Sequence, residues 1–196
     1  MARPKFADGD FFTAARNIAA ERGPAAVTVG SISERLSAPV GSFYHRFASR
    51  DVLLGELWLQ TVNDFQRGIA AALDAGDGLR AALHTPSWVR VHPEEARLLL
   101  LYHRDDFVQG EWPATLRERV AAHRAQSRIG TERFAQLVLG HTGPKEIRYS
   151  QFLLAELPVS VVRQHLRRRE PPPPLVDELI RITFAAVVDS YRSRRR

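Results

Sequence analysis

The chain of 196 residues contains no cysteine and only one methionine. The absence of cysteine excludes disulfide bonds, thiolate catalysis and cysteine-ligated metal sites. No apolar run approaches the roughly 18 residues that cross a bilayer. The N-terminal sequence MARPKFADGDFF also lacks the apolar segment of a secretory signal. From these absences we expect a cytoplasmic protein without a membrane partner.

Motifs that carry common enzyme chemistry are missing as well. The sequence has no glycine-rich phosphate loop, no nucleophile-elbow serine motif and no His-Glu-x-x-His zinc motif. The histidines beyond residue 80 lack the i, i+4 spacing of a helical metal pair, so that only folding could gather them: His84, His92, His103, His123, His141 and His165. We therefore predict no enzymatic activity, no cofactor and no metal.

The N-terminal part of the chain has no excess of positive charge. The whole chain carries 28 basic and 22 acidic residues, a formal net charge of +6. Residues 1–75 contain eight of each, so the excess lies beyond residue 75, where 20 basic residues face 14 acidic ones. Much of it lies in 163–169 and 192–196, and such runs are usually solvated helix ends. Any DNA binding must therefore depend on a local motif.

Such a motif is present at residues 28–47, TVGSISERLSAPVGSFYHRF. Thr28 can cap a first helix whose apolar residues recur at the spacing of one buried face. The segment 37–39 then interrupts the pattern; Ser37 is a cap residue, and Pro39 is tolerated in a first turn. Apolar spacing resumes from Val40 to Phe47. Two short helices joined by a tight turn are typical of a helix-turn-helix, whose second helix enters the major groove of DNA.

The residues around this motif extend the pattern. An apolar stripe from Phe11 to Ala19 predicts a preceding helix that ends before Gly23, and Ser49 can cap a long following helix. Over roughly Phe11 to Leu57, this order resembles the TetR (tetracycline repressor) family of bacterial transcription regulators. The matching residues are Ala14-Ala15, Gly23, Thr28-Val29, Ile32, Gly41-Ser42-Phe43-Tyr44-His45, Phe47 and Ser49-Arg50-Asp51-Val52-Leu53-Leu54.

The resemblance implies which residues contact double-stranded DNA: Thr28, Val40, Gly41, Ser42, Tyr44, His45 and Arg50. It implies that the Tyr44 hydroxyl meets a phosphate while its ring packs inward, and that Arg50 meets the phosphate backbone. From the residues alone, Tyr44 can also be a core residue and Thr28 only a cap. Arg46 is a candidate for an additional phosphate contact. The chain departs from the family pattern at Ser37, where glycine is usual, and at Val40, where a polar or basic residue is usual. Valine can contact a thymine methyl group but cannot hydrogen-bond a guanine.

The rest of the chain predicts an all-α fold, because no segment shows sustained period-two alternation. We expect helices near 7–21, 29–37, 39–46, 50–75, 79–91, from 93 onward, 113–139, after 144 and near 175–194. Pro86 should disturb the fifth helix, and Pro158 should kink or split the eighth. Residues 1–49 then form a three-helix DNA-binding domain that helix 50–75 continues. Residues 76–196 form a helical effector-binding and dimerisation domain.

The last two helices have more apolar surface than a solvent-exposed helix needs: Phe152, Leu153, Val159 and Val162 on one, and Leu179, Ile182, Ala186, Val187 and Val188 on the other. In the TetR family these helices form the homodimer interface, and the resemblance implies the same here. The alternative is that both pack within their own domain. A dimer would bind two half-sites of a pseudo-palindromic operator.

The resemblance further implies repression that is released by a small effector bound in the C-terminal domain. Its candidate contacts are Trp88, Tyr102, His103, Phe107, Trp112, His123, Phe134 and Phe152. This set favours a mainly apolar or aromatic effector with a few polar anchors. Two other functions remain open: a DNA-binding protein without an effector, and a helical interaction protein without DNA binding.

Overall fold

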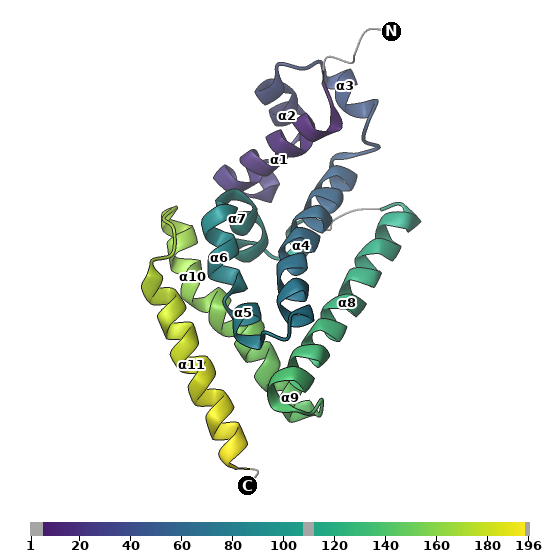
Figure 1. The fold of residues 1–196 in the computed structure, drawn as a ribbon. Coiled ribbons are helices and arrows are strands. Elements are labelled where there is room, and N and C mark those ends of the chain that lie inside the picture. The colour runs from purple at the N-terminus through teal and green to yellow at the C-terminus, as the bar shows by residue number, and fades with distance from the viewer. Residues whose placement is uncertain (1–5, 108–111, 195–196) are drawn as a thin grey trace. The chain divides into compact units, whose positions relative to one another are not determined.

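The computed structural model describes residues 6–107 and 112–194 (Figure 1). It is 82% helical, and no strand occurs among the described residues, which confirms the predicted all-α class. None of the described helices is both long enough and apolar enough to span a lipid bilayer. The α-helices are α1 (Asp8–Arg22), α2 (Val29–Leu36), α3 (Val40–Tyr44), α4 (Arg50–Asp74), α5 (Gly78–Ala82), α6 (His84–Val91), α7 (Pro93–Leu101), α8 (Ala114–Leu139), α9 (Pro144–Gln151), α10 (Leu157–Arg168) and α11 (Pro174–Ser193).

The chain divides into two compact units, each built from two stretches of sequence. Unit 1 comprises Met1–Val62 and Glu94–Val120, and unit 2 comprises Asn63–Pro93 and Ala121–Arg196. The long helices α4 and α8 each contribute residues to both units. The predicted boundary near residue 75, between a DNA-binding part and an effector-binding part, is a division by function and differs from these packing units. It stays a prediction.

Aromatic side chains from three separate elements make the centre of unit 1. The ring of Phe11 on α1 lies 6.1 Å from that of Phe43 on α3 and 5.9 Å from that of Phe47, measured between centroids. Phe43 and Phe47 are themselves 5.4 Å apart. Phe11 and Phe43 are fully buried. This cluster fixes the short helix α3 against α1, because a five-residue helix has little stability of its own.

Helix α2 begins at the cap that the sequence predicts. The backbone N–H of Ser31 donates to the Thr28 hydroxyl at 3.0 Å, and the Thr28 N–H donates to the Ser31 hydroxyl at 2.9 Å. Likewise, the Val52 N–H donates to the Ser49 hydroxyl at 3.2 Å, which confirms Ser49 as the cap of α4. The N-caps predicted at Thr28 and Ser49 are therefore confirmed.

The turn between α2 and α3 differs from the expectation. Ser37 does not cap the second helix; it ends α2 in the left-handed conformation, with φ 51° and ψ 41°. A left-handed residue at this position explains why glycine suits it, because glycine lacks the Cβ that crowds such a conformation. The residue before α3 is Pro39, which provides no side-chain cap, and α3 is shorter than the predicted 39–46.

A second core fills unit 2, where Phe134 and Leu153 are fully buried. Gly78 allows α5 to approach α8 closely, since a Cβ at that position would lie 2.3 Å from a methyl group of Val138. The role of this glycine is therefore one of packing.

Two prolines act in ways that refine the predictions. The expected helix 79–91 is two helices, α5 and α6, that separate at Leu83. In one continuous helix the Pro86 ring would clash with the Ala82 carbonyl, four residues earlier, and would leave it without its N–H donor. Pro158 does not interrupt the helical run from Pro144 to Arg168. Instead, residues Phe152–Glu156 form a π turn, in which the Leu157 N–H donates to the Phe152 carbonyl. The wider turn keeps the segment helical although the proline N–H is missing.

The chain leading into α11 is held by one arginine within unit 2. The guanidinium of Arg90 donates to the Pro172 carbonyl at 2.8 Å and to the Pro173 carbonyl at 3.1 Å. It also pairs with the Asp177 carboxylate at 2.6 Å. These contacts anchor the proline spacer and the first turn of α11 to α6.

Candidate functional site

Helix α3 carries the large hydrophobic side chains that unit 1 exposes. Val40 is 48% exposed and Tyr44 is 59% exposed. Among the described residues of unit 1, no other large hydrophobic side chain is this exposed. Side chains one helical turn apart lie on the same face, so Val40 and Tyr44 form one outward surface. Both residues belong to the set that the sequence predicts to contact DNA.

The orientation of Tyr44 corrects one expectation. Its side chain is exposed rather than packed inward, and its ring meets that of Phe43 edge-on, with 5.4 Å between the ring centroids. Phe43, which is fully buried, occupies the core position instead. The alternative that Tyr44 is a core residue is therefore excluded, and both its ring and its hydroxyl are available at the surface.

The remaining predicted residues of α3 lie beside this surface. A Cβ at Gly41 would meet no atom within 4 Å, so the backbone there is open to close approach by a large partner. His45 is exposed and Ser42 is half-buried. Thr28 is exposed at the start of α2 while its hydroxyl forms the cap. The structure thus gathers the α3 residues on one outward element, with Thr28 on the neighbouring helix.

Arg50 has a structural role that the sequence did not reveal. Its Nε donates to the Val27 carbonyl at 2.5 Å, and its Nη2 donates to the Pro24 carbonyl at 2.8 Å. Its Nη1 pairs with Asp51 at 2.9 Å. All three guanidinium nitrogens therefore bind within the protein, and this arginine ties the start of α4 to the loop before α2. A phosphate contact by Arg50 stays a prediction.

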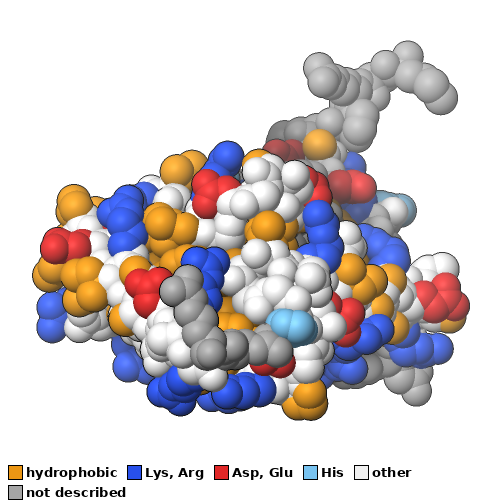
Figure 2. All heavy atoms as spheres, turned by 60° about the horizontal axis from the view of Figure 1, so that its bottom comes forward, with side chains coloured by type: hydrophobic (Ala, Val, Ile, Leu, Met, Phe, Trp, Pro, Cys, Tyr) orange, Lys and Arg blue, Asp and Glu red, His pale blue; other side chains and the backbone are white. Residues whose placement is uncertain are grey.

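The two other arginines between residues 28 and 50 are also engaged. Arg46 donates to the Phe6 carbonyl at 2.5 Å and pairs with Asp8 at 3.2 Å. Arg35 donates two hydrogen bonds to Glu21, at 2.8 and 2.5 Å, and this hydrogen bonding raises the pKa of Arg35. Figure 2, which turns the bottom of Figure 1 forward, shows Lys and Arg side chains beside hydrophobic and acidic ones.

The eight candidate effector residues are divided between the two units. In unit 1, Phe107 and Trp112 are buried in the first core, Tyr102 packs beside Gly23, and His103 is exposed. In unit 2, Phe134 belongs to the second core and Phe152 packs against it. These residues are therefore not gathered around one site within either unit.

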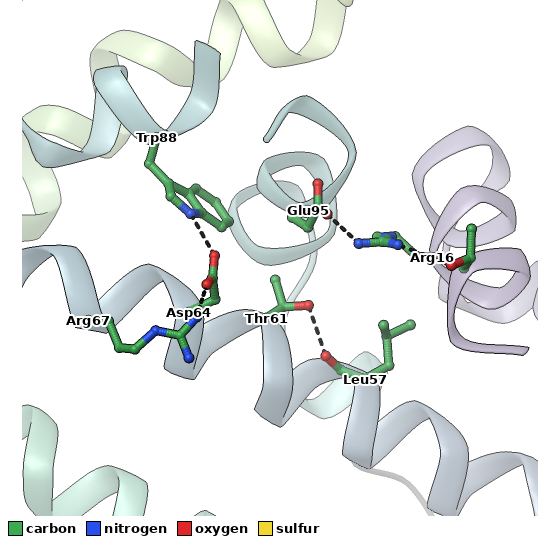
Figure 3. A network of polar contacts seen from close by, with 8 residues as sticks. Arg16, Leu57, Thr61, Asp64, Arg67, Trp88 and Glu95 are labelled. Atoms are coloured by element: carbon green, nitrogen blue, oxygen red, sulfur yellow. Dashed lines mark hydrogen bonds and ion pairs between the residues drawn. The ribbon is translucent and has the colours of Figure 1, made fainter. Parts of the chain in front are cut away.

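Trp88 and His123 also bond within unit 2. The Trp88 indole N–H donates to the Asp64 carboxylate at 3.1 Å, as Figure 3 shows. His123 lies 3.1 Å from the Asn63 side-chain oxygen, and its burial lowers its pKa. Figure 3 also shows the pairing of Arg16 with Glu95, which links α1 to α7 within unit 1. The tryptophan and the histidine have structural partners, which explains their burial without a ligand.

A cavity in unit 2 has a different lining from the one the sequence suggested. Its volume is about 450 Å³, within the range of small-molecule sites. The lining contains none of the eight predicted residues and consists of Gly68, Ala71, Asp77, Leu79, Arg80, Leu83, His84 and Ser87. In the sequence, this cavity could have been suspected from Gly68, because a glycine inside a long helix often marks a place where another part of the chain packs closely.

His84 explains the need for that glycine. A Cβ at Gly68 would lie 2.0 Å from the imidazole Cε1, so only glycine accommodates the ring. The ring hydrogen-bonds the Phe65 carbonyl, whereas its buried Nε2 has no partner among the residues that the structure describes. Burial lowers the pKa of His84, although Asp64 and the Phe65 carbonyl oppose this shift. The imidazole is therefore neutral at pH 7, and Arg80 is the cationic side chain of the lining.

Helix α11 exposes a second apolar surface in unit 2. Leu175, Leu179 and Ile182 are 57%, 44% and 59% exposed. Their spacing of i, i+4 and i+7 places them on one face of the helix. By contrast, Leu153, Val162 and Val188 of the expected interface are buried within unit 2. No group of three or more residues suited to a metal ion occurs among the described histidines and carboxylates.

Comparison with known families supports the reading of the N-terminal region. Residues 11–57 match the family model described as "Bacterial regulatory proteins, tetR family". The match begins and ends where the resemblance was expected, and it includes α1, α2, α3 and the start of α4. No curated protein matches the chain. The matched segment contains every predicted DNA-contact residue.

Proposed function

We propose, from the match of residues 11–57 to the TetR family of bacterial regulatory proteins, that the chain is a regulator of this family and acts as a homodimeric repressor. It binds a pseudo-palindromic operator and is released by a small, mainly apolar or aromatic effector. The observation that carries the proposal is the outward surface of α3, where unit 1 exposes Val40 and Tyr44. The proposal includes a cytoplasmic location and no catalytic activity.

Dimerisation follows from the size of the DNA-binding surface. A helix of five residues can contact only a short stretch of DNA, so two copies are needed for useful affinity. The stripe Leu175, Leu179 and Ile182 on α11 supports a self-complementary interface, because a two-fold axis pairs the same patch from both copies. Buried residues of α10, such as Val162 and Leu166, then pack in the interior of unit 2 and do not contact the second copy.

The cavity in unit 2 supports the effector part of the proposal. It combines apolar residues, Leu79 and Leu83, with the charged residues Asp77 and Arg80. An effector that binds here releases DNA only if it prefers the conformation with low DNA affinity. Helix α4 supplies residues to this cavity and also begins within the DNA-binding unit, so one continuous helix connects the two activities.

The decisive experiment is the selection of genomic DNA fragments by the purified full chain at physiological salt. We expect one pseudo-palindromic sequence to be enriched by the wild type and lost with Tyr44→Ala. Tyr44→Phe separates the ring from the hydroxyl and should retain part of the affinity. Val91→Ala provides a matched control, because Val91 is 71% exposed on α6 in the other unit. An absence of any enriched site would favour the helical interaction protein without DNA binding.

A second experiment tests effector release. A panel of aromatic and aliphatic compounds is screened for loss of operator binding, and any active compound is repeated with Ala71→Trp, which fills the cavity. We expect the variant to bind the operator normally and to resist release. If no compound releases the wild type, the effector-independent DNA-binding protein becomes the better description. If the variant is released like the wild type, the effector binds elsewhere.

A further inference from the structure

The surface of α3 and its preceding turn lacks charge. Residues 37–45, SAPVGSFYH, include no lysine, arginine, aspartate or glutamate. The exposed large hydrophobic side chains on this segment are Val40 and Tyr44. A surface that reads guanine usually presents arginine or lysine to the O6 and N7 acceptors. This segment has neither, so its recognition chemistry has to be apolar or based on hydroxyl, imidazole and backbone groups.

The neighbouring arginines do not supply the missing charge. Arg46 and Arg50 bind backbone carbonyl groups and carboxylates of unit 1, and Arg35 is paired with Glu21. Releasing any of them to reach a base would break hydrogen bonds that hold α1, α2 or α4. Base recognition at α3 therefore falls to the residues that α3 itself exposes.

Val40 is placed to contact a base edge. It is the first residue of α3, and the N-terminal residues of a recognition helix are those that contact bases. The next residue, Gly41, adds no side chain, and nothing lies within 4 Å of the Cβ position there. The backbone can therefore approach the DNA closely enough for a short side chain such as valine to reach the groove.

Only one feature of the major groove is apolar. Thymine presents a C5-methyl group, whereas the other bases present hydrogen-bond donors and acceptors that valine cannot satisfy. We propose that Val40 is a specificity-determining residue that packs against a thymine methyl group, so that each operator half-site has a thymine opposite the start of α3. This inference rests on the proposed function, because it concerns the operator that the dimer selects.

The test uses the selected operator with one thymine at a time replaced by deoxyuridine, which removes only the methyl group. At one thymine per half-site we expect about a fourfold loss of affinity, and about a fifteenfold loss when both half-sites are changed. The loss should disappear with Val40→Ala and persist with the control Val91→Ala. Thermal melting checks that Val40→Ala folds as the wild type does.

A second substitution tests the same contact without a protein variant. Replacing that T·A pair by 5-methylcytosine·guanine keeps the methyl group, whereas replacing it by cytosine·guanine does not. We expect the methylated pair to bind better. Equal binding of both pairs, or deoxyuridine sensitivity that is unchanged in Val40→Ala, would overturn the inference while the proposed function stands. Failure to select any operator would overturn both.

Discussion

The two units expose hydrophobic side chains in different ways. Unit 1 presents Val40 and Tyr44 from a helix of five residues, next to a glycine and a left-handed turn. Unit 2 presents Leu175, Leu179 and Ile182 as a stripe along a helix of 20 residues. A short, isolated surface suits the reading of a few base pairs, whereas a long stripe suits association with a second copy.

The use of arginine also differs between the units. In unit 1, Arg46 and Arg50 bond inward to backbone carbonyl groups, and residues 37–45 carry no lysine, arginine, aspartate or glutamate. In unit 2, Arg90 clamps the spacer before α11, while Arg80 lines a cavity. Arginine is therefore structural in both units, whereas Arg80 of unit 2 lines a cavity. Only the contacts distinguish a structural arginine from one available to a ligand.

The largest expected effect comes from truncating one aromatic residue in each core. Phe43→Ala and Phe134→Ala remove fully buried rings from unit 1 and unit 2, respectively. Each should lower the free energy of unfolding by about 3–5 kcal/mol. Hydrogen exchange should show lost amide protection in α1–α3 for Phe43→Ala and in α8–α11 for Phe134→Ala. Uniform loss across both units in either variant would show that the two cores unfold as one.

The second prediction concerns the stripe on α11. Ile182→Arg places a charge in the proposed interface, where it would be buried without a partner. We expect a monomer by light scattering and a loss of operator affinity of about a hundredfold or more, because the second half-site is no longer held. Val91→Arg adds the same charge to another exposed position and should change neither property. A dimeric Ile182→Arg protein would move the interface away from this stripe.

Local patterns made the helix-turn-helix predictable from the sequence. Its caps depend on residues three apart, such as Thr28 with Ser31, and its core positions follow helical spacing. Ser37 was misassigned because serine suits either end of a helix, and only the backbone angles distinguish the two. The prediction that Tyr44 packs inward failed since Phe43, beside it, has the same apolar character.

Unit 2 was less predictable because its features depend on contacts distant in the sequence. The bulky aromatics chosen as effector contacts are the residues that best fill a core, as Phe134 does. The cavity is lined by small, polar and leucine residues from α4, α5 and α6, where the ring of His84 packs on Gly68. No short motif encodes such a fit, although the glycine within α4 marks it.

The third prediction is a pH dependence that belongs to unit 2. Burial lowers the pKa of His84 and of His123, both of which lie in that unit. The unfolded chain therefore binds protons more readily than the folded one as the pH falls through the usual histidine range near 6.5. Stability should decline on acidification, by less than the loss from a core truncation. In urea unfolding between pH 7.5 and 5.5, the double variant His84→Asn, His123→Asn should show a weaker decline; an unchanged decline would assign it to other groups.

The smallest expected effect is on stability, at the two described residues other than glycine that adopt the left-handed conformation. Ser37 ends α2 in unit 1 with φ 51°, and Arg169 ends α10 in unit 2 with φ 59°. A residue with a Cβ pays about 1 kcal/mol of steric strain in this conformation. Glycine avoids the strain, but its unfolded chain has more conformational entropy to lose, which offsets part of the gain. Ser37→Gly and Arg169→Gly should therefore each raise the free energy of unfolding by up to about 1 kcal/mol in urea titrations. Operator affinity should stay unchanged in Arg169→Gly. If Ser37→Gly stabilises unit 1 but weakens operator binding, the serine hydroxyl contacts DNA as well as ending the helix.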